Sequence, residues 1–385
     1  MRMVPLGDLM ASRVPSLDPS KYPKEVFELW SIPAFDTGQP EITEGANIGS
    51  SKKCVEPNDV LLSRIVPHIR RAWVVSKSQN EMRQLASSEW IVFRDESFYP
   101  DYLRHALTSD SFHSRFMQTV AGVGGSLLRA RPDGVKKIKI PLPPLEEQRR
   151  IAAILDKADG VRRKRKEAIR LTEELLRSTF LEMFGDPVTN PKGWEICELQ
   201  NVCNRVTDGT HQPPNWADEG IPFLFVSNIV NGEIDFKVSK HITEESWFEL
   251  TSRCPIEIND ILYTTVGSYG NAALVRTKNR FCFQRHIAHI KPDSRSIEPE
   301  FLLGMMQSDW IRQQADKQAR GVAQKTLNLR ELKKFTIFTP PIEEQKKYVK
   351  LRQGVEKQLS YYRSALEQSE NLFNSLLQKA FRGEL

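Results

Sequence analysis

Residues 142–159 read LPPLEEQRRIAAILDKAD, and residues 339–356 read TPPIEEQKKYVKLRQGVE. The Pro-Pro-x-Glu-Glu-Gln phrase in these segments recurs at a constant offset of 197 residues in a chain of 385. Proline is tolerated in the first turn of a helix, where its missing N–H costs nothing, and glutamate suits the positive end of the helix dipole. Both segments are therefore predicted to begin helices in a chain that repeats itself after about half its length.

Each copy of the phrase leads into a long segment with helical periodicity. In the second copy, mostly apolar side chains alternate in steps of four and three, which is a heptad seam: Val355, Leu359, Tyr362, Leu366, Ser369, Phe373, Leu376 and Ala380. The first copy keeps the register, although Arg162 and Arg165 weaken its middle: Ile151, Leu155, Ala158, Ile169, Thr172, Leu176 and Met183. We expect two helices of about 40 residues, roughly 60 Å long at 1.5 Å per residue, that pack on each other.

The region before each predicted helix is also repeated, more faintly. Asn58-Asp59-Val60-Leu61 resembles Asn259-Asp260-Ile261-Leu262, and Ser109-Asp110 resembles Ser308-Asp309. Short β-branched and aromatic runs between turn residues are typical of strands. The predicted fold is α+β, with two mixed α/β globular domains at 1–142 and 186–338 and two helices at 143–185 and 339–385.

Composition and charge favour a globular protein with a polyanionic partner. The chain is 39% hydrophobic and 27% charged, and no apolar run approaches the roughly 20 residues that span a bilayer. The five cysteines are odd in number and never spaced C-x-x-C, which favours a reducing compartment over a disulfide framework or zinc finger. The net charge of +6 is gathered in basic segments, including 129–140 and 157–170, which suits a polyanion. The run at 162–166 is either a solvated helix face or a surface turned toward DNA or an acidic subunit.

The whole chain resembles the specificity subunit of type I restriction–modification enzymes. The most specific parts are the two Pro-Pro-x-Glu-Glu-Gln phrases, with Ile151-Ala152-Ala153-Ile154-Leu155 after the first, and Asp208-Gly209-Thr210-His211 ahead of Gly220-Ile221-Pro222-Phe223. The resemblance implies two target-recognition domains in a pseudo-two-fold arrangement, separated by an antiparallel coiled coil, each reading half of a split site in double-stranded DNA. It implies a cytoplasmic prokaryotic protein, with no membrane, that docks two methyltransferase subunits and restriction/translocase subunits. S-adenosylmethionine, ATP and Mg²⁺ are expected on those partners, and no cofactor on this chain.

Three loops of the second domain carry groups that can bond base edges, because Asn and Gln pair with adenine and Thr, Ser and His are adaptable. The alternatives are an ordinary turn for 207–216, with Gly209 supplying a positive φ, and a tight hairpin for 264–271. The candidate DNA-binding residues of the second domain are Asp208, Thr210, His211, Gln212, Asn215, Ser268, Tyr269, Asn271, Gln324 and Lys325.

The first domain has basic segments at the corresponding places, 64–71 and 124–131. Arginine can bond guanine O6 and N7 through two donors or bind phosphate, and a single arginine more often contacts phosphate. The candidate DNA-binding residues of the first domain are Arg64, His68, Arg70, Arg71, Ser126, Arg129 and Arg131.

Enzyme motifs are not apparent in the sequence. Gln212-Pro213-Pro214-Asn215 fails as an amino-methyltransferase motif, and Glu344-Gln345-Lys346 lies in the helix-start repeat rather than in a nuclease site. No Walker lysine motif, glycine-rich cofactor turn or H-E-x-x-H spacing occurs. We therefore expect a non-catalytic chain. A nuclease or methyltransferase with an unrecognised active site, a stand-alone DNA-binding protein and a coiled-coil scaffold that binds only protein remain as alternatives.

Overall fold

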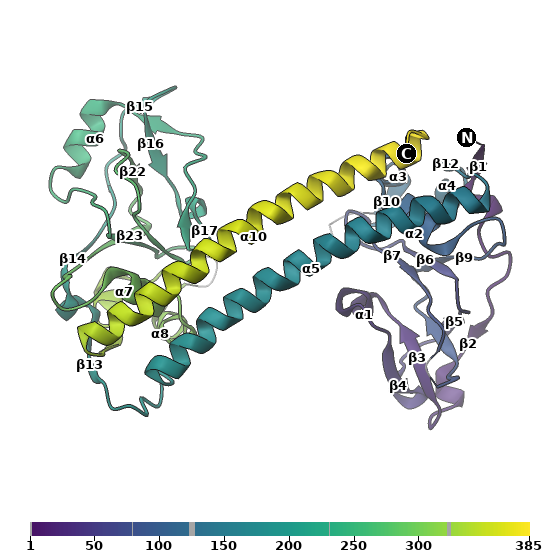
Figure 1. Cartoon of the computed structure of the whole chain (residues 1–385), viewed down its shortest axis with the longest axis horizontal. Helices are drawn as coiled ribbons and strands as arrows, with labels where there is room; N and C mark the ends of the chain where they lie inside the picture. The colour runs from purple at the N-terminus through teal and green to yellow at the C-terminus, as the bar shows by residue number, and fades with distance from the viewer. Residues whose placement is uncertain (1, 79, 123–127, 231, 322–324) are drawn as a thin grey trace. The chain divides into compact units, whose positions relative to one another are not determined.

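The chain forms two compact units. A computed structural model describes residues 2–78, 80–122, 128–230, 232–321 and 325–385. Unit 1 comprises Met1–Ala168 with Tyr362–Leu385, and unit 2 comprises Ile169–Tyr361. Helices α5 (Leu145–Phe184) and α10 (Ile342–Arg382) are continuous, so each contributes one half to each unit (Figure 1). The two long helices predicted from the sequence are confirmed.

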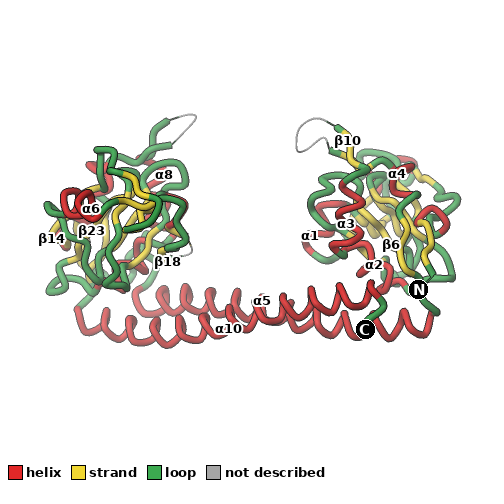
Figure 2. Tube along the Cα trace, turned by 90° about the horizontal axis from the view of Figure 1, so that it is seen from above, coloured by secondary structure: helices red, strands yellow, loops and turns green. Residues whose placement is uncertain are grey.

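Unit 1 is a mixed α+β unit whose helices flank the strands around β6 (Figure 2). Its helices are α1 (Ile32–Thr37), α2 (Pro100–Thr108), α3 (Asp110–Met117) and α4 (Pro132–Lys136), with short 3-10 turns η1 (Leu6–Asp8), η2 (Pro19–Lys21) and η3 (Gly45–Asn47). Its strands are β1 (Met3–Pro5), β2 (Ser16–Leu17), β3 (Val26–Trp30), β4 (Glu41–Glu44), β5 (Lys52–Cys54), β6 (Val60–Ser63), β7 (Ala72–Val74), β8 (Gln84–Ala86), β9 (Trp90–Phe93), β10 (Val120–Ala121), β11 (Arg129–Ala130) and β12 (Lys139–Pro141).

Unit 2 repeats this plan with different loops. Its helices are α6 (Glu244–Thr251), α7 (Pro299–Met306), α8 (Asp309–Gln318) and α9 (Leu329–Lys333), with 3-10 turns η5 (Leu199–Val202) and η6 (Val226–Asn228). Its strands are β13 (Glu195–Glu198), β14 (Cys203–Asp208), β15 (Trp216–Ala217), β16 (Ile221–Leu224), β17 (Ile229–Val230), β18 (Glu233–Ile234), β19 (His241–Ile242), β20 (Ile261–Thr264), β21 (Ala272–Leu274), β22 (Cys282–Phe283), β23 (Ile287–Pro292) and β24 (Thr336–Thr339).

The strand pairing shows that the sequence repeat is a repeat of topology. In unit 1, β6 pairs antiparallel with β7 and β9, and in unit 2, β20 pairs antiparallel with β21 and β23. Each unit also has a second sheet with one parallel pair, β3 with β8 and β16 with β22. The first strand of each unit pairs antiparallel with the strand before the long helix, β1 with β12 and β13 with β24. The expected α+β fold class is confirmed.

Both units use the same turn before the central strand of the antiparallel sheet. Asn58 and Asn259 adopt left-handed φ angles of 75° and 74°, a region that asparagine tolerates better than most residues. The next residues, Asp59 and Asp260, are buried, and each carboxylate accepts a hydrogen bond from a backbone N–H three residues earlier, at 2.9 and 2.7 Å. The Asn-Asp repeat seen in the sequence is therefore a repeated turn.

The halves of the long helices belong to the cores of the units. In unit 1, Ile151 and Leu155 of α5 are buried in one cluster with Phe373, Leu377 and Ala380 of α10. In unit 2, Phe180 and Phe184 of α5 have their ring centroids 5.4 and 5.5 Å from that of Tyr348 of α10, and Leu359 of α10 is also buried. Of the other predicted seam positions, Ser369 is also buried and the rest are half-buried: Ala158, Ile169, Thr172, Leu176, Met183, Val355, Tyr362, Leu366 and Leu376.

Arginines occupy the middle of the seam in unit 1, where the sequence predicted weaker packing. Arg165 donates hydrogen bonds to the Ala365 carbonyl and the Ser369 hydroxyl of α10. The Arg162 guanidinium lies 4.6 Å from the centroid of the Phe373 ring and is paired with Asp159 at 2.5 Å. Arg150, near the start of α5, donates to the carbonyl of Leu385 at 2.6 Å. The two helix halves of unit 1 therefore run antiparallel, because higher residue numbers on α5 meet lower ones on α10.

Candidate nucleic-acid interface

Three loops of each unit are held together by equivalent backbone hydrogen bonds. In unit 1, Arg64 N–H donates to the Glu89 carbonyl and Ala130 N–H donates to the Arg64 carbonyl, at 3.1 and 2.8 Å. In unit 2, Thr265 N–H donates to the His286 carbonyl and Leu327 N–H donates to the Thr265 carbonyl, at 2.9 and 2.8 Å. Backbone donors in loops need such partners when water is excluded. The two units therefore present three corresponding side-chain positions on one frame.

The side chains at these three positions differ completely between the units. In unit 1 they are Arg64, Glu89 and Arg129, and the carboxylate of Glu89 lies 2.8 Å from Arg64 Nε and 3.4 Å from Arg129 Nε. The corresponding side chains of unit 2 line a pocket. Unit 1 has an ion-paired cluster at these positions, whereas unit 2 has hydroxyl groups and a neutral imidazole. The two units therefore offer different hydrogen-bonding patterns on the same backbone.

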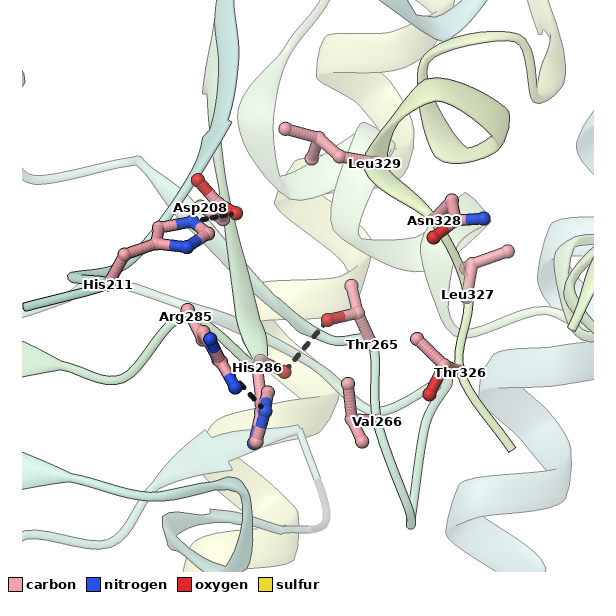
Figure 3. Close-up of a pocket in the computed structure, with 10 residues that line it drawn as sticks. All are labelled: Asp208, His211, Thr265, Val266, Arg285, His286, Thr326, Leu327, Asn328 and Leu329. Atoms are coloured by element: carbon pink, nitrogen blue, oxygen red, sulfur yellow. Dashed lines mark hydrogen bonds and ion pairs between the residues drawn. The ribbon is translucent and has the colours of Figure 1, made fainter. Parts of the chain in front are cut away.

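In unit 2 the corresponding residues are Thr265, His286 and Thr326, and all three line a pocket of about 390 Å³ (Figure 3). Asp208 and His211 form one wall, where His211 Nε2 lies 2.8 Å from the Asp208 carboxylate. The opposite wall runs from Thr326 to Leu329, and Val266 completes the lining. The pocket thus joins the 207–216 and 264–271 segments predicted from the sequence.

The pocket floor carries a basic pair that the sequence analysis did not single out. Arg285 Nε lies 3.4 Å from His286 Nε2 (Figure 3). Burial, followed by the charges of Arg285 and His211, lowers the pKa of His286. A neutral His286 has an acceptor nitrogen that Arg285 can use, so the pair offers a fixed charge beside a neutral imidazole. The only sequence signal for this pair is the internal repeat, which aligns His286 with Glu89 of unit 1.

The 207–216 segment is shaped by a glycine that lies against the backbone. A Cβ added to Gly209 would lie 2.3 Å from the Phe283 carbonyl oxygen, so only glycine fits. The alternative reading, in which Gly209 supplies a positive φ for an ordinary turn, is wrong on this point, because the φ of Gly209 lies outside the left-handed region and close approach is the reason for glycine. His211, Gln212 and Asn215 are exposed, and Thr210 is half-buried with its hydroxyl donating to the Gln212 carbonyl at 2.9 Å.

Tyr269 does not face solvent, which corrects its assignment as a DNA contact. Its side chain is buried, its hydroxyl donates to Asp316 at 2.6 Å, and Arg312 lies 4.6 Å above its ring. The aromatic ring anchors the 264–271 loop on α8 instead. Ser268 of the same loop is exposed, and the half-buried Asn271 donates its side-chain amide to the Ser268 carbonyl at 3.0 Å. Lys325 is exposed, whereas Gln324 lies outside the described residues.

Arg71 is also buried, which corrects its assignment. Its side chain is 9% exposed and donates to both carboxylate oxygens of Asp36, each at 3.1 Å. Arg70 is exposed and lies 2.6 Å from the Asp110 carboxylate. A buried, ion-paired guanidinium is not available to a duplex, so Arg71 fixes the 64–71 loop on α1.

The remaining candidates of unit 1 lie on its surface. His68, Arg129 and Arg131 are exposed, and Arg64 is half-buried beside Glu89. Ser126 lies outside the described residues. Within the ranges that the structure describes, no helix is both long and apolar enough to cross a bilayer. Among the same residues, no group of three or more His, Cys, Asp or Glu side chains is arranged to hold a metal ion.

Comparison with known proteins identifies a repeated domain. The family model described as "Type I restriction modification DNA specificity domain" matches residues 4–171 and again residues 191–361. The specificity subunit of type I restriction enzyme EcoBI from Escherichia coli is 30% identical over 279 residues, which cover 64% of this chain and 58% of that subunit. The chain therefore spans less than two thirds of that relative's length. The MjaIX specificity subunit from Methanocaldococcus jannaschii is 21% identical and covers 90% of this chain and 82% of its own.

Solved structures share the fold. A chain from a structural study of complex assembly and conformational transition in the type I R-M system has a TM-score of 0.55 at 23% identity, covering 100% of this chain and 98% of its own. The crystal structure of a type I restriction-modification S subunit from M. genitalium has a TM-score of 0.56 at 14% identity, covering 99% and 96%. At these identities the likeness concerns the fold alone.

Proposed function

The chain belongs to the type I restriction modification DNA specificity domain family and carries that domain twice, and we propose on this basis that it is a DNA-recognition subunit. Each unit reads one half of a bipartite target in double-stranded DNA. The chain holds no cofactor and catalyses nothing itself. It assembles in the cytoplasm with two methyltransferase subunits and with restriction/translocase subunits, which carry S-adenosylmethionine, ATP and Mg²⁺.

One observation carries this proposal: three loop positions are held by matching backbone bonds in both units and filled by unrelated side chains. Arg64, Glu89 and Arg129 in unit 1 correspond to Thr265, His286 and Thr326 in unit 2. Folding requires only the matching backbone hydrogen bonds. A protein that recognises two different half-sites also needs different hydrogen-bond donors and acceptors at the equivalent positions. Different side chains at equivalent positions of a shared frame are what discrimination between two half-sites requires.

The pocket of unit 2 has the chemistry to contact base edges and phosphates together. Arg285 supplies a fixed positive charge and donors that fit phosphate or guanine, and Thr326 supplies a hydroxyl, whereas Thr265 is buried and donates its hydroxyl to the His286 carbonyl at 3.0 Å. The neutral His286 and the exposed Gln212 can donate and accept. In unit 1, the exposed Arg129 and Arg131 and the half-buried Arg64 supply the basic counterpart. These residues replace Arg71 and Tyr269 in the proposed interface.

The test transplants the unit 1 side chains into unit 2. The triple variant Thr265→Arg, His286→Glu, Thr326→Arg is assembled with methyltransferase subunits, and its genomic methylation pattern is sequenced. We expect the half-site read by unit 1 to persist, while the half-site read by unit 2 changes or methylation ceases. Arg295→Ala is the control, because Arg295 is a highly exposed basic residue that does not line the pocket, and its target should be unchanged.

Two results would contradict the proposal. An altered unit 1 half-site in the triple variant would mean that the units do not read independently. Absence of binding to any duplex at low salt by the assembled wild-type complex would favour a scaffold that binds only protein, because phosphate contacts alone should give measurable affinity there.

A further inference from the structure

Unit 2 contains a cysteine, a histidine and an aspartate in a hydrogen-bonded row. The Sγ of Cys254 lies 3.4 Å from His289 Nδ1, and His289 Nε2 lies 2.6 Å from the Asp260 carboxylate. His289 and Asp260 are buried, whereas Cys254 is half-buried. A thiol beside a histidine that a carboxylate orients is the arrangement that activates a cysteine as a nucleophile.

The aspartate and histidine of this row are held rigidly. Asp260 precedes β20 and also accepts from Glu257 N–H at 2.7 Å and from Lys291 at 2.8 Å. His289 lies in the middle of β23, paired in the ladder with Leu262. The imidazole therefore has one orientation, with Nε2 toward Asp260 and Nδ1 toward the sulfur.

The scaffold does not require the histidine. Asp59 of unit 1 occupies the turn position of Asp260, and Arg94 binds it at 2.7 Å as Lys291 binds Asp260. The strand position equivalent to His289, facing Leu61 as His289 faces Leu262, is filled by Val92, which is buried in an apolar cluster. Unit 1 forms the same sheet with a valine there, so the Cys254–His289 contact is an addition to the frame.

Cys254 opens into a pocket of about 270 Å³. The lining includes Arg205, Arg253 and residues 208–210. Arg205 donates to the Arg253 carbonyl at 2.6 Å, which places its guanidinium beside the residue before the cysteine. His289 contacts the sulfur, and the charges of Arg205 and Lys291 also act on it, while Asp260 lies behind the imidazole and Glu257 and Asp260 pair with Lys291. A small reagent can enter, and the charge favours a thiolate.

The pKa of Cys254 is shifted in the opposite direction to the pKa values of the other four cysteines. Burial would raise the pKa of Cys254, but the hydrogen bond and charge of His289, with Arg205 and Lys291, outweigh it and lower that pKa. Burial likewise opposes the charged imidazole of His289, but its bonds to Asp260 and Cys254 raise its pKa. Burial raises the pKa of Cys203 to about 12 and of Cys282 to about 11, and it also raises the pKa values of Cys54 and Cys197.

We propose that Cys254 is a redox-modification site, a thiolate paired with the His289 imidazolium that reacts with hydrogen peroxide to give a sulfenic acid. The sulfur attacks one peroxide oxygen, an S–O bond forms as the O–O bond breaks, and the sulfur is oxidised by two electrons. The second oxygen leaves as hydroxide and takes the proton of His289 to become water, which leaves a neutral imidazole and Cys254 as S–OH. The peroxide is reduced, so atoms and electrons balance.

The experiment measures modification of each cysteine in the full-length chain by peptide mass spectrometry. The protein is treated with hydrogen peroxide and a dimedone trap, and separately with iodoacetamide, from pH 6 to pH 9. Cys254 should react at least ten times faster than Cys197 or Cys54 at pH 7, because these half-buried cysteines have raised pKa values. Its rate should also reach half its maximum at a lower pH than theirs.

Two variants separate activation from exposure. His289→Val copies the valine of unit 1 and should lower the rate at Cys254 to within a few-fold of that at Cys197, whereas Cys254→Ser should abolish the fast site. Equal rates at Cys254, Cys197 and Cys54 in the wild-type protein would overturn the proposal. So would an unchanged Cys254 rate in a folded His289→Val protein. If that variant does not fold, the wild-type comparison of sites and pH profiles decides alone.

Discussion

The side-chain oxygen of Gln148 accepts a hydrogen bond from the backbone N–H of Tyr99, the residue that precedes α2, at 2.7 Å. In unit 2, Gln345 does the same with the N–H of Glu298, which precedes α7, at 2.8 Å. Each glutamine amide also donates to the carbonyl of the first proline of its own phrase, at 2.8 and 2.7 Å. The glutamine of the repeated phrase thus joins the start of a long helix to the start of a helix in the adjoining globule.

Gln148→Ala or Gln345→Ala should lower the free energy of unfolding by about 1–3 kcal/mol, because each would leave a backbone N–H unsatisfied where water has little access. Both glutamines are buried. Urea denaturation of each variant measures the loss. Gln353→Ala, at an exposed position of α10, is the matched control and should differ from wild type by less than about 0.5 kcal/mol. Equal values for Gln345→Ala and Gln353→Ala would contradict the role given to the amide.

Leu359→Asp should destabilise unit 2 by several kcal/mol, because the charge would replace a side chain that is 4% exposed. Leu351→Asp on the same helix is the control, because Leu351 is 52% exposed. Thermal unfolding and co-purification with methyltransferase subunits report on both. If the two variants have the same melting temperature, Leu359 does not pack as described.

Arg71→Ala and Arg129→Ala should have opposite phenotypes, although both remove a guanidinium. The first removes a buried partner of Asp36 and should reduce stability while leaving the salt dependence of DNA binding unchanged. The second removes an exposed charge and should lower the slope of log K against log salt by about 0.9 if it contacts one phosphate. Anisotropy titrations of the assembled complex over a range of salt distinguish them. A lower slope of log K against log salt for Arg71→Ala would show that Arg71 contacts DNA after all.

Gln212→Ala should weaken binding to the cognate duplex by about 1–3 kcal/mol if its amide bonds a base edge. Binding to a scrambled duplex should barely change, since no charge is lost. Both duplexes are titrated with the assembled complex. Equal losses on the two would reject base reading by the 207–216 segment and leave the 264–271 segment as the reader.

His105 should make unit 1 less stable as the pH falls from 7 to 5. It is buried, and this burial lowers its pKa, despite the hydrogen bond of Nε2 to Asp156 at 2.8 Å. Below the ordinary histidine pKa of about 6.5 the unfolded chain takes up a proton that the folded chain does not. The free energy of unfolding therefore decreases as the pH is lowered, by less than about 1.4 kcal/mol for each pH unit. His289, whose pKa is raised, acts in the opposite direction. Urea denaturation should show a smaller loss toward pH 5 in His105→Gln than in wild type, and equal pH dependence would contradict the assignment.

The shared architecture of the two units could be predicted from the sequence because the motifs that form it occur twice. The Pro-Pro-x-Glu-Glu-Gln phrase, the Asn-Asp turn and the heptad steps each have a local cause, and all occur in the structure. The exposures of Arg71 and Tyr269 depend instead on Asp36 and Asp316, which lie 35 and 47 residues away in the chain. Arg285 and His286 reach the pocket only through strand pairing that no local pattern encodes. Long polar side chains suit a surface or a buried ion pair equally well, so tertiary partners decide their place.

Unit 1 is discontinuous, and this affects the order of events during synthesis. Its core contains Ile151 and Leu155 together with Phe373, Leu377 and Ala380, so residues 1–168 lack part of their interior until residues 362–385 are made. The intervening chain, Ile169–Tyr361, is the whole of unit 2. At about 5–20 residues per second, its translation takes roughly 10–40 s. During that interval Ile151 and Leu155 lack their α10 contacts, which makes nascent unit 1 the stage at which a chaperone would act.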